Sequence, residues 1–133
     1  MIPIELAKII IDEKNPDQVV ILKEKGGHRQ VPIVIGFMEV TSIQMRVSGA
    51  ESPRPLTHDL LAAVIQSLGA EAEALVITDI IDGTFYAKLR VKNQGGEAVD
   101  VDCRPSDGIA LAVRLNIPMF VDERVFKKSA ESH

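Results

Sequence analysis

Two similar segments of the chain combine an Arg-Pro pair with a hydroxyl residue, an Asp and an apolar run. They occupy residues 53–60 (PRPLTHDL) and 102–107 (DCRPSD). Pro suits the start of a helix, and Ser or Thr with Asp suits a cap or first turn. Free N–H groups, the positive end of the helix dipole and an adjacent guanidinium together favour an anion such as phosphate. The predicted substrate-binding residues are Arg54, Thr57, Arg104 and Ser106.

A purely structural role for these arginines remains open. Arg54 and Arg104 can pair with Asp59, Asp107 or a backbone carbonyl and thereby fix the start of each helix, because charge clusters also serve structural ends. The repetition of the motif in a short chain favours a shared site over two separate structural pairs.

Acidic residues near these segments suggest a cation site. Asp100 and Asp102 are two positions apart on a predicted strand and therefore share one face. If the two helix starts lie close together, Asp59, Asp102 and Asp107 gather around His58. Carboxylates prefer hard cations, so Mg²⁺ or Mn²⁺, held by Asp102 and Asp107, is the expected metal. Such an ion polarises a phosphodiester and activates water, although the spacing matches no established ligand motif and exposed structural acids are the alternative.

His58 is the histidine best placed for acid–base chemistry, because His28 follows a Gly-Gly turn. An imidazole can exchange protons near neutral pH. The alternative is a first-turn side chain bonded to a backbone group. Glu39 lies in the first turn of another predicted helix, where it stabilises the dipole, with a role in the site as the second interpretation. The predicted catalytic residues are His58, Asp59, Asp102 and Asp107.

The composition indicates one soluble, cytoplasmic domain. A chain of 133 residues with 46% hydrophobic and 26% charged residues is long enough for a core, so we expect a single domain over 1–133. The net charge of −4 argues against an extended basic surface for nucleic acid. This net charge is compatible with an enzyme that binds one phosphate group at a time. The single Cys103 predicts an inert core thiol in a reducing compartment, and no apolar run approaches membrane-spanning length.

Several common functional motifs are absent from the sequence. There is no P-loop, no Gly-x-Gly-x-x-Gly, no His-Glu-x-x-His, no Cys-x-x-Cys and no nucleophile elbow around a serine. Dinucleotide-binding, zinc-peptidase and acyl-transfer functions therefore have no support.

The hydrophobic pattern predicts an α+β fold with a largely antiparallel or mixed sheet and about three helices. The expected strands are 3–11, 18–25, a third ending at 35, 72–81, 84–92, 97–103 and 119–121, and the expected helices are 36–47, 57–68 and 106–115. Residues 127–133 are expected to be a frayed tail. Leu75, Ile77 and Ile81 on the 72–92 hairpin exceed the needs of one buried face, which predicts partial cover by another element or by a second subunit. A homo-oligomer, most simply a dimer, is therefore expected.

The motifs together resemble the bifunctional nuclease domain family. The resemblance rests on residues 32–36 with Glu39, on residues 53–60, on residues 84–87 and on residues 102–112, and it extends over about residues 4–125. It implies a compact, self-associating α+β domain with nuclease activity on both DNA and RNA. Gly108 stands where Ala is usual in the family.

The leading hypothesis is a metal-assisted nuclease that hydrolyses phosphodiester bonds in DNA and RNA. Arg54 and Arg104 would hold phosphate, the three aspartates would hold metal or water, and His58 would be the acid–base group. The alternative is a non-catalytic oligomer that binds an anion or a partner through the same helix N-termini.

Overall fold

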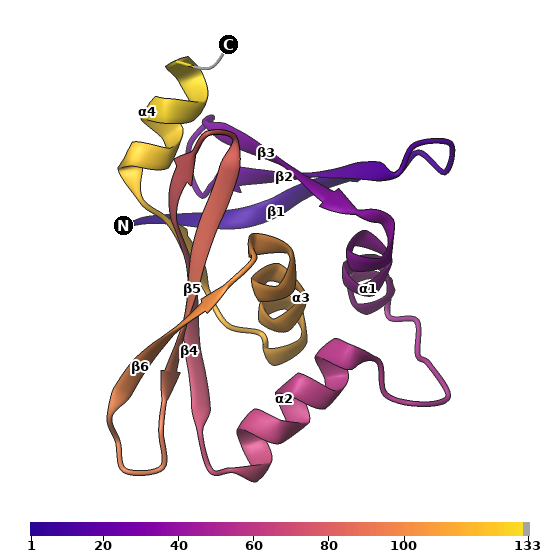
Figure 1. Cartoon of the computed structure of the whole chain (residues 1–133), viewed down its shortest axis with the longest axis vertical. Helices are drawn as coiled ribbons and strands as arrows, with labels where there is room; N and C mark the ends of the chain where they lie inside the picture. Colours follow the sequence, from indigo (N-terminus) through magenta and orange to yellow (C-terminus); the bar gives the residue numbers. More distant parts are fainter. Residues whose placement is uncertain (132–133) are drawn as a thin grey trace.

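A computed structural model describes residues 1–131, which form one seven-stranded sheet and four helices (Figure 1). The strands are β1 (Ile2–Ile10), β2 (Asp17–Glu24), β3 (Gln30–Gly36), β4 (Glu71–Ile81), β5 (Thr84–Lys92), β6 (Ala98–Cys103) and β7 (Met119–Val121). The helices are α1 (Phe37–Ser48), α2 (Thr57–Ser67), α3 (Pro105–Leu115) and α4 (Glu123–Glu131). The predicted α+β class is confirmed, and the structure adds a fourth helix.

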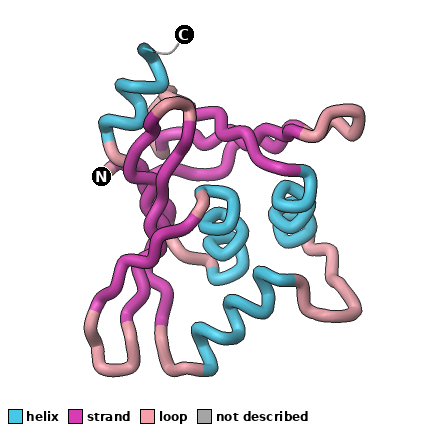
Figure 2. Tube along the Cα trace, viewed as in Figure 1, coloured by secondary structure: helices cyan, strands magenta, loops and turns pink. Residues whose placement is uncertain are grey.

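The sheet joins two antiparallel groups through one short strand. Its order is β3-β2-β1-β7-β4-β5-β6, with β7 antiparallel to β1 and parallel to β4. The sheet curls, so that β1–β3 and β4–β6 lie on two sides of α3, while α1 and α2 complete the enclosure (Figures 1 and 2). This curvature brings the segments before α2 and α3 together, although 49 positions separate His58 from Asp107.

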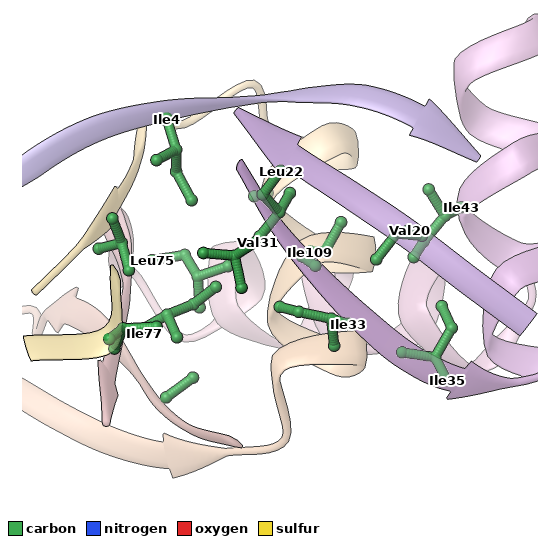
Figure 3. Close-up of a cluster of buried hydrophobic side chains, with 14 of the residues drawn as sticks. Ile4, Val20, Leu22, Val31, Ile33, Ile35, Ile43, Leu75, Ile77 and Ile109 are labelled. Carbon is green, nitrogen blue, oxygen red and sulfur yellow. The ribbon is translucent and has the colours of Figure 1, made fainter. Parts of the chain in front are cut away.

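The core that holds this arrangement is almost entirely aliphatic. Val20, Leu75, Ile77 and Ile109 are fully buried, and side chains from both halves of the sheet meet α3 in the cluster of Figure 3. The chain has four Phe, one Tyr and no Trp, so branched aliphatic side chains must supply most of the packing. Their burial, at about 25 cal/mol per Å² of apolar surface, is the main force that fixes the helices against the sheet.

Glycines have structural roles at two positions. Gly108 lies on the buried side of α3, where an added methyl group would overlap the Cδ1 atom of Leu75 and come within 3.3 Å of the Cys103 sulfur. A glycine at this position therefore lets α3 approach β4 closely. Gly83 has a φ of +79° in the β4–β5 turn, as the Asp82-Gly83 pair predicted.

The structure decides between two expectations for the hairpin and adds to the description of the C-terminal segment. Leu75 and Ile77 are part of the core, because their face of β4 is covered by another element of the same chain, helix α3; only Ile81 of that group is exposed. Residues 127–131, expected to be a frayed tail, continue helix α4. Val125 and Phe126 are buried there, and the Arg29 guanidinium lies 4.4 Å from the centre of the Phe126 ring. The last two positions of the expected tail lie outside the described residues.

No helix within residues 1–131 is long and apolar enough to cross a membrane.

Candidate functional site

The N-termini of α2 and α3 converge, as the repeated motif predicted. His58, the second residue of α2, contacts Asp107, the third residue of α3, through a 2.9 Å hydrogen bond. Helix α3 also packs against α1, so that α1, α2 and α3 lie together on one side of the curled sheet (Figure 1). A cavity of about 300 Å³ opens where they meet. It is lined by Met38, Glu39, Thr41, Ser42, Met45, Leu56, Thr57, His58, Arg104 and Asp107.

Five polar side chains in this cavity form one continuous chain of hydrogen bonds. The Ser42 hydroxyl lies 2.8 Å from Nδ1 of His58, and Nε2 of His58 lies 2.9 Å from Oδ1 of Asp107. Nε of Arg104 donates to Oδ2 of Asp107 at 2.8 Å, and Nη1 of Arg104 donates to Glu39 at 3.4 Å. We call this set the Ser42–Glu39 chain.

The hydrogen bonds fix the protonation of the neutral His58 ring. An ionised carboxylate only accepts hydrogen bonds, so Nε2 of His58 carries a proton and donates it to Asp107. Nδ1 is then the basic nitrogen, and the Ser42 hydroxyl donates to it. The ring is 8% exposed, so its orientation is set by these two partners rather than by solvent.

The Asp107 carboxylate is held in its charged form. Its partial burial opposes ionisation, but the hydrogen bonds from Arg104 and His58 outweigh burial and place the pKa of Asp107 below its usual range. Arg104 contacts both carboxylate oxygens, in the two-pronged geometry that suits a guanidinium. An ionised Asp107 can stabilise a proton that His58 acquires.

Arg104 anchors Asp107 and is at the same time exposed to solvent in the cavity. Its side chain is 67% exposed even though it is bonded to Asp107 and Glu39, so N–H groups remain available to a ligand in the cavity. The first-turn N–H groups of α2 have no acceptor within the helix, and Thr57 is exposed at the cavity wall. The cavity therefore offers a guanidinium and a helix N-terminus to an anion.

Three of the predicted residues lie elsewhere. Arg54 is exposed and does not line the cavity, so the expected pair of arginines is not assembled. Asp102 is on the edge strand β6 with a side chain that is 75% exposed, and Lys88 is 3.6 Å from it. Ser106 is buried behind Arg104 and lines a separate hollow of about 320 Å³ between β3 and the β4–β5 turn.

Asp59 also faces away from the cavity. Its Oδ2 accepts the backbone N–H of Leu56 at 2.9 Å, and its Oδ1 accepts Nε of Arg114 at 2.6 Å. The Leu56 N–H and the Arg114 guanidinium hold the pKa of Asp59 below its usual range. The side chain of Arg114 is only 6% exposed and also donates to the Ser42 carbonyl at 3.3 Å. The pair thus ties α2 to α3 and to α1.

Replacing Asp59 with Ala should therefore destabilise the fold rather than remove chemistry. The change deletes an N-terminal cap and leaves a buried guanidinium without its acid. We expect a loss of roughly 2–3 kcal/mol, below the value for a fully buried pair because Asp59 is 41% exposed. Urea unfolding measures the loss, and Asp59→Asn, which keeps the capping oxygen, should lose less. Full stability with abolished activity would contradict this assignment.

The described residues do not form a ready-made metal site. Among residues 1–131, no group of three or more His, Cys, Asp and Glu side chains is placed to hold an ion. Both oxygens of Asp107 are bonded to Arg104, and one of them also to His58, whereas Asp102 lies on β6 in an exposed ion pair with Lys88. Asp102 and Asp107 therefore do not fit the two-aspartate ligand set expected from the sequence.

Sequence reasoning overlooked Ser42 and gave Glu39 only a secondary place. Both lie on α1, which the sequence predicted from partial periodicity, and neither belongs to an Arg-Pro motif. Ser42 is polar at a buried helical position, between the fully buried Val40 and Ile43. A hydroxyl on the buried face of a helix needs a hydrogen-bond partner. This requirement was the feature of the sequence that could have identified Ser42. Cys103, by contrast, is half-buried, and burial raises its thiol pKa to about 11, as expected for an unreactive cysteine.

Comparison with known proteins agrees with the motif pattern. The sequence profile of the bifunctional nuclease domain matches residues 20–133. An uncharacterized protein of Mycobacterium tuberculosis is 36% identical over 126 residues, covering 95% of this chain and 74% of its own length. Bifunctional nuclease 1 of Oryza sativa subsp. japonica and Bifunctional nuclease 1 of Arabidopsis thaliana are each 27% identical, over 85% and 81% of this chain. The chain spans about a third of the length of these plant relatives. The chain belongs to the bifunctional nuclease domain family.

Proposed function

We propose that the chain is a nuclease that hydrolyses phosphodiester bonds in DNA and RNA at the cavity between α1, α2 and α3. The observation that carries the proposal is the Ser42–Glu39 chain. In it, His58, Asp107 and Arg104 are joined by hydrogen bonds where two helix N-termini converge. A guanidinium next to a hydrogen-bonded histidine and carboxylate supports the proposal, because phosphodiester hydrolysis uses stabilisation of charge on the phosphate and transfer of a proton. Membership of a family that includes named nucleases supports the same reaction class.

The proposed roles follow the contacts. Arg104 and the first turn of α2 bind the phosphate and stabilise the charge that develops on its oxygens. His58 accepts a proton from the attacking water, and Asp107 keeps the resulting imidazolium stable and oriented. Arg54, Asp59 and Asp102 receive no place in the reaction. A divalent cation stays a prediction, and its ligands would have to come from residues other than Asp107, whose oxygens are bonded to Arg104 and His58.

The test is a degradation assay on labelled single-stranded DNA and RNA with the purified chain. Parallel reactions contain Mg²⁺, Mn²⁺ or an excess of chelator. We expect cleavage of both polymers, and its loss in chelator would establish the metal requirement. Absence of cleavage under every condition would refute the nuclease proposal.

A non-catalytic alternative uses the same cavity. Glu39 and Asp107 partly neutralise Arg104, and the cavity is small enough for a single phosphate-bearing group. Binding of a mononucleotide in the cavity without turnover of any polymer would favour this alternative. The degradation assay therefore separates the two functions.

We further propose that the protein self-associates through the exposed face of α2. His58 is the only buried residue of this helix, whereas Leu60, Leu61, Val64 and the following Leu68 are between 41% and 69% exposed. A run of large apolar side chains on one helix is unusual on a monomer surface and suits a two-fold contact with a second copy.

Light scattering should report a dimer for the wild type at micromolar concentration. Leu60→Glu places a charge in the proposed contact, so it should shift the mass to that of a monomer. Val34→Glu is the matched control, because Val34 is 60% exposed on the edge strand β3 while Leu60 is 58% exposed. A monomeric wild type, or equal dissociation by both variants, would contradict the proposed interface.

A further inference from the structure

The strongest unassigned feature of the molecule is the hydroxyl of Ser42. It lies in the wall of the cavity, on the buried side of α1, 2.8 Å from Nδ1 of His58. A hydroxyl inside a helix ordinarily bonds to the carbonyl four residues earlier, as Thr41 does with Phe37 at 2.8 Å. The Ser42 hydroxyl instead faces a ring whose protonation matters for the proposed reaction.

Both ring nitrogens of His58 already have a side-chain partner. Nδ1 is bonded to Ser42 and Nε2 to Asp107, and the side chain is only 10% exposed. The shortest route for a proton between His58 and water in the cavity therefore leads through one of these two partners.

Asp107 is the poorer route of the two. Its carboxylate is bonded to Arg104 through both oxygens, and a proton placed on it would neutralise the charge that supports both Arg104 and His58. A serine hydroxyl, in contrast, accepts one hydrogen bond while it donates another. The Ser42 backbone is also held in place, because Arg114 donates to its carbonyl at 3.3 Å.

We propose that Ser42 is a catalytic residue whose hydroxyl carries a proton between a water molecule in the cavity and Nδ1 of His58. The proposal rests on the proposed nuclease function and adds the path of the proton to it. The water gives a proton to Oγ of Ser42 as Ser42 gives its own proton to Nδ1 of His58. The hydroxide so formed attacks phosphorus, and the bond from phosphorus to the departing nucleoside oxygen breaks.

The remaining proton transfers complete the cycle. The departing oxygen takes a proton from solvent at the mouth of the cavity. His58 then returns its Nδ1 proton through Ser42 to solvent, which restores the starting state. The net reaction consumes one water and yields a phosphate monoester and an alcohol.

Three variants test the proposal. Ser42→Ala removes the hydroxyl and should lower kcat by roughly 10²-fold, the lower end of the effect of a positioned proton-transfer group, with little change in KM. Ser42→Thr keeps a hydroxyl and should restore most of the rate. Ser48→Ala is the matched control, because it makes the same change on the same helix at an exposed serine that bonds within α1, to the Met45 carbonyl, and lies outside the cavity lining. We expect it to stay within about threefold of the wild type, as expected for removal of a group outside the proton path.

Two further readouts separate proton transfer from a structural role. The rate in mixtures of H₂O and D₂O should fall along a curve for the wild type, because two protons move together, and along a line for the residual activity of Ser42→Ala. Nitrogen-15 NMR should show His58 protonated at Nε2 in the wild type and in Ser48→Ala, and loss of the hydrogen bond to Nδ1 in Ser42→Ala.

The outcomes distinguish the Ser42 proposal from the nuclease function on which it rests. A wild type that cleaves no nucleic acid overturns both. An active wild type with Ser42→Ala within threefold of its rate, or with a linear solvent-isotope dependence, overturns the Ser42 proposal alone. A phosphate trapped covalently on Ser42 also overturns it, since attack would then come from the serine rather than from water.

Discussion

Replacing Asp107 with Asn is expected to lower kcat/KM for nucleic-acid cleavage by roughly 10²- to 10⁴-fold, the range for loss of a positioned acid–base system. The neutral amide removes the charge that stabilises protonated His58 and breaks the two-oxygen pairing with Arg104. It can also turn an N–H group toward Nε2, which favours the wrong ring tautomer. Initial rates on a labelled single-stranded substrate measure the loss, and circular dichroism confirms that the variant is folded.

Asp102→Asn is the matched control for this experiment. It makes the same chemical change five positions earlier, but at an edge-strand side chain that is 75% exposed and contacts only Lys88 in the described structure. The sequence placed both aspartates in the catalytic set, whereas the structure leads us to expect Asp102→Asn within about threefold of the wild type, as for a surface ion pair of little energetic weight. Equal losses would extend the site to β6 and contradict its confinement to the cavity.

Replacing Arg104 with Met should lower kcat/KM by roughly 10²- to 10³-fold, the usual effect of removing a donor that stabilises developing charge. The guanidinium is the most exposed cation of the cavity and also fixes Asp107. Arg104→Lys should recover only part of the rate, because an ammonium group cannot contact both carboxylate oxygens and a phosphate in the same planar geometry.

Arg54→Met provides the comparison for Arg104. Each arginine belongs to one copy of the Arg-Pro motif, but Arg54 is exposed and lies outside the cavity lining. We expect its replacement to change kcat/KM by less than about threefold, since a surface charge away from the reacting group acts only through the screened long-range field. A large loss at Arg54 with a small one at Arg104 would overturn the assignment of the phosphate-binding cation.

The elements of the fold were predictable because their local patterns are strong. The Asp82-Gly83 turn, the alternation along residues 71–92 and the Pro at the start of α3 each have one favoured structure. Helix α4 was missed because its burial depends on two adjacent residues, Val125 and Phe126, and on Arg29 from the distant turn between β2 and β3. A tertiary contact of this kind leaves no local pattern in the sequence.

The candidate site was only partly predictable, and the difference has a physical cause. Asp107, His58 and Arg104 were identified because their types and the repeated motif indicate chemistry. Asp59 and Asp102 are also aspartates close to the motifs. Their side chains point away from the cavity, Asp59 toward Arg114 and Asp102 toward Lys88, and the sequence does not reveal these directions. Ser42 was missed because a serine inside a helix gives no indication of its partner until α2 is placed against α1.

The central claim is that the phosphodiester bond is held and cleaved in the cavity between α1, α2 and α3. The most direct measurement is a crystal structure of the protein with a dinucleotide whose bridging oxygen is replaced by a methylene group, so that it cannot be cleaved. We predict its phosphorus group within hydrogen-bonding distance of Arg104, facing Ser42 and His58. A dinucleotide seated at Arg54 or along β6, with the cavity vacant, would contradict the claim.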